Sequence, residues 1–103
     1  MTDRAQFVHD TRRIVAVNVL MCELFRCEPY QLVDLDMMEL ISNETFRGLA
    51  RLRMVMLRER GTVPAFTYYF RRCDGTRFAA EVKSERLDDG DFRTTLFYLR
   101  EIA

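Results

Sequence analysis

The sequence predicts an α+β domain in which a cluster of helices covers one face of a five-stranded antiparallel sheet. Three alternating runs near the C-terminus, joined by turns that contain Asp and Gly, predict a meander of antiparallel strands. A β-branched apolar run near the N-terminus predicts a buried strand, and a long segment with apolar residues at helical spacing predicts an amphipathic helix. The apolar stripe of that helix needs a partner, so we expect it to pack against the sheet.

Two short strands are predicted at the start of the chain. The first is Gln6 to His9, and the second is Ile14 to Val17, a continuous apolar run that is typical of a buried strand. The polar residues from Asp10 to Arg13 lie between them and are predicted to form a turn. The first half of the sheet is therefore expected to be a small hairpin.

Three short helices are predicted after these strands. Asn18 suits an N-cap, because its side-chain oxygen can accept a hydrogen bond from an otherwise unpaired amide, and a helix from about Val19 to Arg26 follows. Proline at a first helical turn favours a second helix at Pro29 to Val33. Asp36 is expected to cap a third helix, Met37 to Ile41.

The longest predicted helix is Glu44 to Arg60. Ser42 or Asn43 is expected to start it, and Gly61 is a natural stop. Apolar residues recur along it at helical spacing and form a wide stripe: Phe46, Leu49, Ala50, Leu52, Met54, Met56 and Leu57. This stripe is the surface that we expect to cover the sheet.

The rest of the chain predicts three strands in sequence. They are Ala65 to Arg72, Arg77 to Arg86 and Phe92 to Glu101. The first turn contains Asp74-Gly75 and the second contains Asp88-Asp89-Gly90, where glycine supplies the positive φ that tight turns require. Consecutive hairpins of this kind produce antiparallel pairing.

The length and charge of the chain limit its function. The 103 residues are 49% hydrophobic and 31% charged, which is typical of one globular domain. Sixteen basic residues balance sixteen acidic ones, so we expect no general attraction to nucleic acid or to anionic lipid. The longest apolar run, Ile14 to Met21, is too short to span a bilayer, and the first residues lack the apolar core of a signal peptide.

The three cysteines, Cys22, Cys27 and Cys73, are odd in number and match no metal-binding or disulfide spacing. We interpret them as reduced, partly buried thiols in a cytoplasmic protein. A redox-sensing thiol is the alternative interpretation.

Four short motifs follow one another along the chain. They are Arg13-Ile14-Val15-Ala16-Val17-Asn18, then Leu24-Phe25 with Pro29-Tyr30-Gln31-Leu32-Val33, then Arg72-Cys73-Asp74-Gly75-Thr76-Arg77-Phe78, and finally Leu99-Arg100-Glu101-Ile102. In this order they resemble the PAS sensory-domain family, over residues 5 to 102. The chain departs from the family pattern at Cys27 and Asp34, where glycine is frequent, and at Glu101, where the closing motif has aspartate.

The resemblance implies a fold and a role. It implies a PAS fold with five antiparallel strands, in which the last strand lies between the first and the fourth, and helices packed on one face. Such domains sense a small molecule, light or redox state, or mediate association, and relay the result to a covalently linked kinase, cyclase or transcription domain. We therefore expect residues 1–103 to be a single PAS domain, excised from a larger cytoplasmic signalling protein.

A small-molecule pocket is expected between the helices and the sheet. Strand parity, matched to the family, points side chains from several strands inward, where they form either a plain core or the wall of a ligand pocket. The candidate pocket residues are His9, Ala16, Met37, Leu49, Met54, Phe66, Tyr68, Phe70, Ala80, Val82, Phe97 and Leu99. No ligand can be named from these residue types.

The familiar cofactors of the family do not match this sequence. In its flavin-binding light sensors a reactive cysteine occupies the position that Met37 holds here, and methionine cannot form the thiol adduct. Haem-binding members commonly use a histidine of the long helix, and Glu44 to Arg60 contains none. The only histidine, His9, is expected to be a packed strand residue, with ligand contact in the pocket as the alternative.

An enzyme is not expected. The two serines, Ser42 and Ser84, have no elbow motif, the four glycines form no phosphate loop, and the acidic turn lacks the calcium-loop pattern. The arginines at 47, 51 and 58 fall on roughly one helix face, which we interpret as a solvated surface, because no groove-reading element accompanies them.

The outer face of the sheet is predicted to be more apolar than solvent exposure favours. Thr94, Leu96 and Tyr98 alternate with the inward residues of the last strand, and Tyr69 is expected on the same outward face. Such a surface is usually buried, so we expect a homodimer or a flanking helix to cover it.

Three hypotheses remain open from the sequence. The first is a ligand-sensing PAS module, and the second is a ligand-free PAS domain that acts only in dimerisation and relay. The third is a small antiparallel α+β enzyme or carrier that shares only the motif order. A sheet order incompatible with PAS would favour the third.

Overall fold

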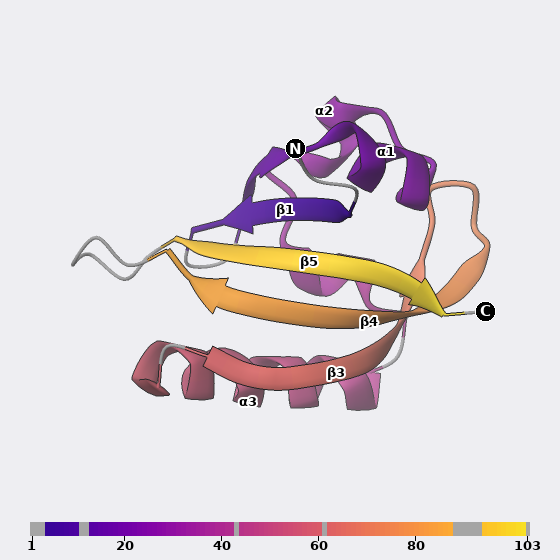
Figure 1. Cartoon of the computed structure of the whole chain (residues 1–103). Helices are drawn as coiled ribbons and strands as arrows, with labels where there is room; N and C mark the ends of the chain where they lie inside the picture. Colours follow the sequence, from indigo (N-terminus) through magenta and orange to yellow (C-terminus); the bar gives the residue numbers. More distant parts are fainter. Residues whose placement is uncertain (1–3, 11–12, 43, 61, 88–93, 103) are drawn as a thin grey trace.

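The computed structural model describes residues 4–10, 13–42, 44–60, 62–87 and 94–102. Its elements follow one another as β1 (Ala5–His9), β2 (Ile14–Val17), α1 (Val19–Phe25), α2 (Pro29–Leu32), the 3₁₀ helix η1 (Met37–Leu40), α3 (Glu44–Arg60), β3 (Thr62–Arg71), β4 (Arg77–Arg86) and β5 (Thr95–Ile102). The sheet has the order β2-β1-β5-β4-β3, and every neighbouring pair is antiparallel. The predicted fold class and the predicted place of the last strand are confirmed (Figure 1).

Local hydrogen bonds explain where the helices begin. The Asn18 side-chain oxygen accepts from the Met21 amide at 2.9 Å and from the Gln6 amide at 3.0 Å, so it caps α1 and holds β1 at the same time. Asp36 caps η1 by accepting from the Met38 amide at 3.0 Å. Both predicted caps are confirmed.

The β3–β4 hairpin closes at the predicted Asp-Gly turn. Gly75 has a φ of +89°, which a side chain would disfavour. The Asp74 carboxylate accepts from the Thr76 amide at 3.0 Å and from the Thr76 hydroxyl at 2.6 Å. These bonds to Thr76 hold the pKa of Asp74 well below its usual range, with a further contribution from Arg26.

Several predicted ends of helices and strands differ from the structure by one residue, and the start of β3 differs by three. β3 begins at Thr62 and not at Ala65, and the register shifts between Val63 and Phe66, around Pro64. Proline is tolerated there because β3 is an edge strand with an irregularity at that point. The predicted Asp88-Asp89-Gly90 turn, the predicted stop at Gly61 and the predicted start at Asn43 lie outside the described residues.

The second strand, β2, contains a bulge that changes which of its side chains point towards the core. His9 pairs with Ile14 and Val8 pairs with Ala16, so Val15 is the extra residue. Ile14 is fully buried, but Ala16 is exposed, and it is Val17 that packs against the core. The prediction that Ala16 points inward is therefore wrong, because strict alternation fails across a bulge.

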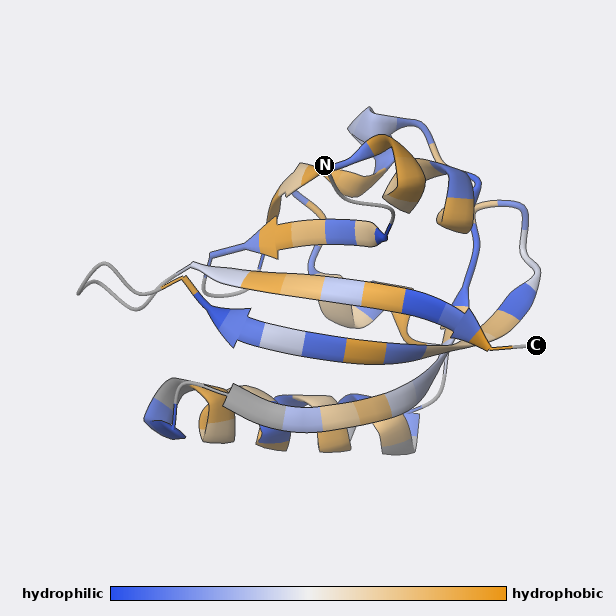
Figure 2. Cartoon of the chain, viewed as in Figure 1, coloured by the Kyte–Doolittle hydropathy of each residue, from blue (hydrophilic) through white to orange (hydrophobic). Residues whose placement is uncertain are grey.

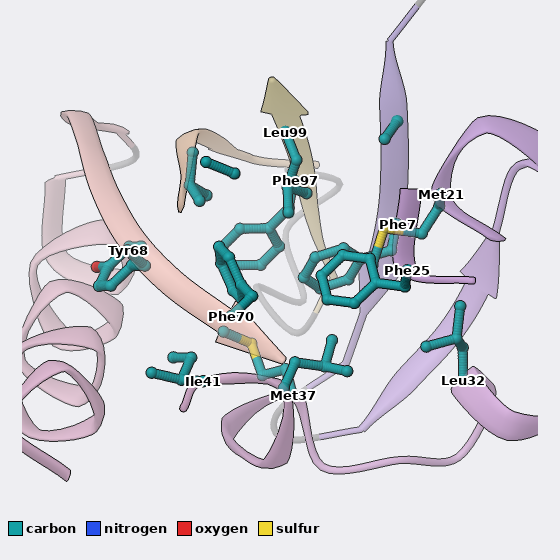
Figure 3. Packing of buried hydrophobic residues seen from close by; sticks show 14 of the residues in the cluster. Phe7, Met21, Phe25, Leu32, Met37, Ile41, Tyr68, Phe70, Phe97 and Leu99 are labelled. Atoms are coloured by element: carbon teal, nitrogen blue, oxygen red, sulfur yellow. The ribbon is translucent and has the colours of Figure 1, made fainter. Parts of the chain in front are cut away.

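The core lies between the inner face of the sheet and the helices. Figure 3 shows Phe7, Met21 and Phe25 gathered near α1, with Phe70 and Met37 towards α3. The rings of Phe7 and Phe97 stack at 4.8 Å, and Phe25 meets Phe70 edge-on at 5.6 Å. Among the described residues, no helix is long and apolar enough to cross a membrane.

Candidate functional site

An apolar cavity lies between α3, η1 and the inner face of the sheet. Its volume is about 30 Å³. Half of its lining residues are aromatic or methionine, and three of them carry polar side-chain groups, Arg53, Tyr68 and Ser84. The lining residues are Phe7, Met37, Leu40, Ile41, Ala50, Arg53, Met54, Pro64, Phe66, Tyr68, Phe70, Val82, Ser84 and Phe97.

The structure brings seven of the predicted pocket residues together at this cavity: Met37, Met54, Phe66, Tyr68, Phe70, Val82 and Phe97. The other five do not line it: His9, Ala16, Leu49, Ala80 and Leu99. Ala80 and Leu99 are buried within the packed core, Leu49 is half-buried on α3, and Ala16 is exposed on β2. Whether the seven bind a ligand remains a prediction.

Arg53, the most distinctive residue of the cavity, was not among the predicted pocket residues. Its position is compatible with the apolar stripe of α3, because it lies three residues after Ala50 and four before Leu57, and both of these are buried. By contrast, Leu52, which we assigned to the stripe, is 59% exposed. A single arginine at a stripe position was the signal that could have identified it.

Arg53 has no charged partner among the residues that the structure describes. Its guanidinium carbon lies 3.6 Å from the centre of the Phe66 ring, which is a cation–π contact. Its Nε atom is buried and has no hydrogen-bond partner, and no carboxylate of the described residues forms an ion pair with it. A buried donor without a partner costs free energy, so a hydrogen bond to this group would be favourable.

Tyr68 supplies a neutral hydroxyl beside this cation. Burial raises the pKa of Tyr68, and the nearby charge of Arg53 lowers it by less. The phenol therefore stays protonated near neutral pH. With Ser84, it gives the cavity two hydroxyl groups that can donate or accept.

His9 lies outside the cavity. It is 1% exposed and stacks on the Phe97 ring at 4.9 Å. Burial lowers the pKa of His9, although Asp10 raises it by a smaller amount, so the imidazole stays neutral at neutral pH. In this structure it is a packed strand residue, as the preferred interpretation expected.

The cavity does not fit the cofactors weighed above. A volume of about 30 Å³ accommodates roughly two water molecules, since a single water needs about 10–15 Å³ measured in this way. Sites for larger organic ligands occupy about 300–1,000 Å³. Met37, which the family resemblance places at the position of the reactive cysteine, lines the cavity, and the free thiol, Cys22, lines a different surface groove.

The outer face of the sheet is less uniformly apolar than predicted. Leu96 and Tyr98 alternate with buried residues of β5 and are half-buried themselves. The adjacent outward positions of β4 are charged, Glu81, Lys83 and Glu85, and Figure 2 shows how hydrophilic that strand is. The apolar area therefore ends at β4 on one side, and on the other side Leu96 is followed by Val8 of β1 and Ala16 of β2.

Tyr69 is not part of that apolar area. It lies on β3, beyond the charged strand β4, and is 50% exposed. Its ring meets the Phe46 ring of α3 at 5.5 Å. Thr94, the fourth predicted interface residue, precedes β5, where its carbonyl accepts from the Leu87 amide at 2.9 Å. Tyr69 is therefore separated from Leu96 and Tyr98, because β4 lies between β3 and β5 and carries charged residues on its outer face.

The cysteines differ from the prediction. Cys27 and Cys73 form a disulfide, with 5.4 Å between their Cα atoms and a separation of 46 in sequence. The interpretation that all three thiols are reduced is wrong, because the fold brings the segment after α1 against the β3–β4 hairpin. Cys22 is the free cysteine and is partly buried.

Comparison of this chain with known proteins identifies its fold. The sequence matches no family model and no curated protein. The structure is similar to the LOV domain of a blue-light activated histidine kinase from Erythrobacter litoralis, with a TM-score of 0.85, 17% identity, and coverage of 100% of this chain and 99% of that one. It is also similar to the PAS domain, in complex with ethanol, of a LuxR-family transcriptional regulator from Burkholderia thailandensis, with a TM-score of 0.81, 17% identity, and coverage of 99% and 91%.

A third similar structure is a PAS domain from a two-component sensor histidine kinase. It matches with a TM-score of 0.77 and 19% identity, over 96% of this chain and 85% of that one. At these identities the similarity concerns the fold. The chain therefore has the PAS fold, as the motif order predicted.

Proposed function

We propose that this PAS-fold chain is a sensory module that binds a small organic anion in its core cavity and relays the binding to an output domain of the same protein. The observation that carries the proposal is Arg53, a cation in the wall of an apolar cavity that forms no ion pair with any carboxylate of the described part of the chain. The similar structures support a sensory role, because they come from sensor kinases and a transcriptional regulator. We propose no catalytic activity for this domain. We also propose that it lies in the cytoplasm.

A carboxylate is the group that suits Arg53 best. Hydrogen bonds between a guanidinium and a carboxylate are about twice as strong as those between neutral groups. The Nε donor is already desolvated, so a ligand oxygen would complete a hydrogen bond that the protein itself leaves unmade. The hydroxyl groups of Tyr68 and Ser84 are further polar groups in the same wall.

The size of the cavity limits the ligand to a few non-hydrogen atoms. The walls contain Met37 and Met54, whose flexible side chains adapt to small changes in shape. One similar PAS domain is itself a complex with ethanol, a molecule of this size. We therefore propose a short-chain monocarboxylate, of which acetate and propionate are the simplest probes.

Changing Arg53→Gln is expected to weaken acetate and propionate binding by about 10- to 100-fold, which corresponds to a charge-assisted hydrogen bond of about 1.5–3 kcal/mol. Titration followed by NMR shifts of cavity residues would measure it. Arg51→Gln is the matched control, because Arg51 is exposed on the same helix. Equal affinity in wild type and Arg53→Gln, or absence of shifts at the cavity, would contradict the anion proposal.

A second candidate function is dimerisation and relay without a ligand. The small volume of the cavity favours it, and so do the apolar side chains of β1 and β5 on the outer face. A second copy of this chain is the occupant we propose. The row Glu81, Lys83 and Glu85 alternates in charge, so two copies related by a two-fold axis could place lysine against glutamate.

Changing Leu96→Glu is expected to shift the sedimentation profile from dimer towards monomer, because it places a charge in the apolar area. Burial of a leucine contributes about 1.5–3 kcal/mol, which is enough to decide a weak association. Leu52→Glu is the control, since Leu52 is 59% exposed on α3. A wild-type domain that sediments as a monomer at high concentration would reject the dimer.

A further inference from the structure

The Cys27–Cys73 disulfide lies at a junction that other contacts also hold. The Cys73 amide donates to the Phe25 carbonyl at 3.0 Å, and the Arg72 Nε donates to the Leu24 carbonyl at 2.8 Å. Arg26 and Asp74 form an ion pair at 2.6 Å across the same junction. These contacts join α1 to the β3–β4 hairpin without the covalent bond, so we expect the hairpin to stay attached, but less firmly, when the disulfide is cut.

The two cysteine residues differ in their exposure to solvent. Cys73 is exposed in the hairpin, whereas Cys27 is 8% exposed. An external thiolate can therefore approach Cys73 and displace Cys27. The Cys27 sulfur lies 3.3 Å from the Phe25 carbonyl oxygen, which can accept a hydrogen bond from the thiol once the bond is cut. The reduced form of Cys27 thus has a partner in place.

The junction is connected to the end of the last strand. Arg72, the neighbour of Cys73, forms an ion pair with Glu101 at 2.9 Å and lies over the Phe78 ring at 4.2 Å. Its side chain is 9% exposed. A change in the position of Cys73 would therefore move the group that ties α1 to the C-terminal end of β5.

Cys22 lies near this disulfide but is not part of it. Its carbonyl accepts from the Cys27 amide at 3.0 Å, and both residues line one surface groove. Partial burial raises the pKa of Cys22, and Glu28 and Glu23 raise it further. The thiol stays protonated near neutral pH and is a poor attacking group, so a spontaneous exchange within the chain is disfavoured.

From this geometry we propose that the Cys27–Cys73 disulfide is a redox-active site whose substrate is a dithiol reductant, and that its cleavage loosens the α1–hairpin junction. A thiolate of the dithiol attacks the Cys73 sulfur, the S–S bond breaks, and Cys27 leaves as a thiolate that takes up a proton. The second thiol of the dithiol then displaces Cys73. Two electrons pass to the protein, which gains two thiols, and the dithiol becomes a disulfide.

The proposal is independent of the ligand cavity, because neither cysteine lines it. Intracellular disulfides of ordinary organisms are usually transient or redox-sensing, so a cytoplasmic location would suit a labile bond. The disulfide would therefore give the domain a second signal to respond to, besides a ligand in the cavity. The outcome of the redox experiment does not change the interpretation of the Arg53→Gln titration.

The test uses the whole chain, air-oxidised and then titrated with dithiothreitol under native conditions. Mass spectrometry after alkylation is expected to find Cys27 joined to Cys73 and Cys22 free, with full reduction of the bond in the absence of denaturant. Hydrogen exchange after reduction is expected to rise about tenfold or more at the hairpin, the end of α1 and the end of β5, with α3 unchanged. Cys22→Ser should behave as wild type, and Cys73→Ser should show the fast exchange with or without dithiothreitol.

Several outcomes would overturn this proposal. All three cysteines could alkylate in the air-oxidised protein, or the bond could resist dithiothreitol until denaturant is added. Exchange could also stay unchanged at the junction after reduction, or rise throughout the chain, which would mean that the disulfide has only a structural role. If Cys73→Ser fails to fold, the dithiothreitol titration of the wild-type protein still distinguishes a redox-active disulfide from a structural one.

Discussion

Changing Phe25→Ala is expected to lower the free energy of unfolding by about 3–5 kcal/mol, a large part of the stability of a domain of this size. Phe25 is fully buried, and its ring meets Phe70 and Phe78 edge-on at 5.6 Å and 5.1 Å. Removing the ring loses its burial and leaves a cavity between α1 and two strands of the sheet. Urea unfolding followed by circular dichroism would measure the change.

The control for this variant is Tyr30→Ala. Tyr30 is 78% exposed on α2, so its truncation is expected to alter the free energy of unfolding by less than about 0.5 kcal/mol. A loss below about 1 kcal/mol for Phe25→Ala would mean that α1 does not pack on the sheet in this way.

Changing Arg72→Met is expected to lower the free energy of unfolding by about 2–3 kcal/mol. The guanidinium donates to the Leu24 carbonyl and to Glu101, and methionine leaves that carbonyl without this donor. Glu101 is about half exposed, so the ion pair itself contributes little and the buried hydrogen bond contributes more. The same urea unfolding experiment applies.

Arg77→Met is the matched control for Arg72→Met. Arg77 lies in the same hairpin and is exposed, so we expect its replacement to change stability by about 0.5 kcal/mol or less. Equal effects of the two variants would show that Arg72 does not connect α1 to β5. The result bears on the redox proposal too, because that proposal needs Arg72 as the connection.

Much of the fold was predictable because it is decided by neighbouring residues. The Asn18 and Asp36 caps depend on amides two or three residues away. The positive φ of Gly75 is a property of that residue in its turn. The bounds of α3 and β4 were predicted to the residue, since alternation and helical spacing are visible within each segment.

The candidate site was predictable only in part. Strand parity correctly pointed Phe66, Tyr68 and Phe97 inward, because parity depends on the strand alone. It failed at Ala16, where a bulge against β1 reverses the phase. The small size of the cavity could not be predicted, because it depends on how side chains from five or more elements fill the space.

The sequence by itself determined the elements, their order and, through the motif resemblance, the PAS fold. Tertiary structure alone decided which distant residues meet. The fold brings Cys27 and Cys73 to bonding distance across a sequence separation of 46. It places Arg53 of α3 beside Phe66 of β3, and it separates Tyr69 from Leu96 by a charged strand. Backbone preferences act over a few residues, whereas these meetings depend on the packing of the whole sheet and its helices, so no local pattern records them.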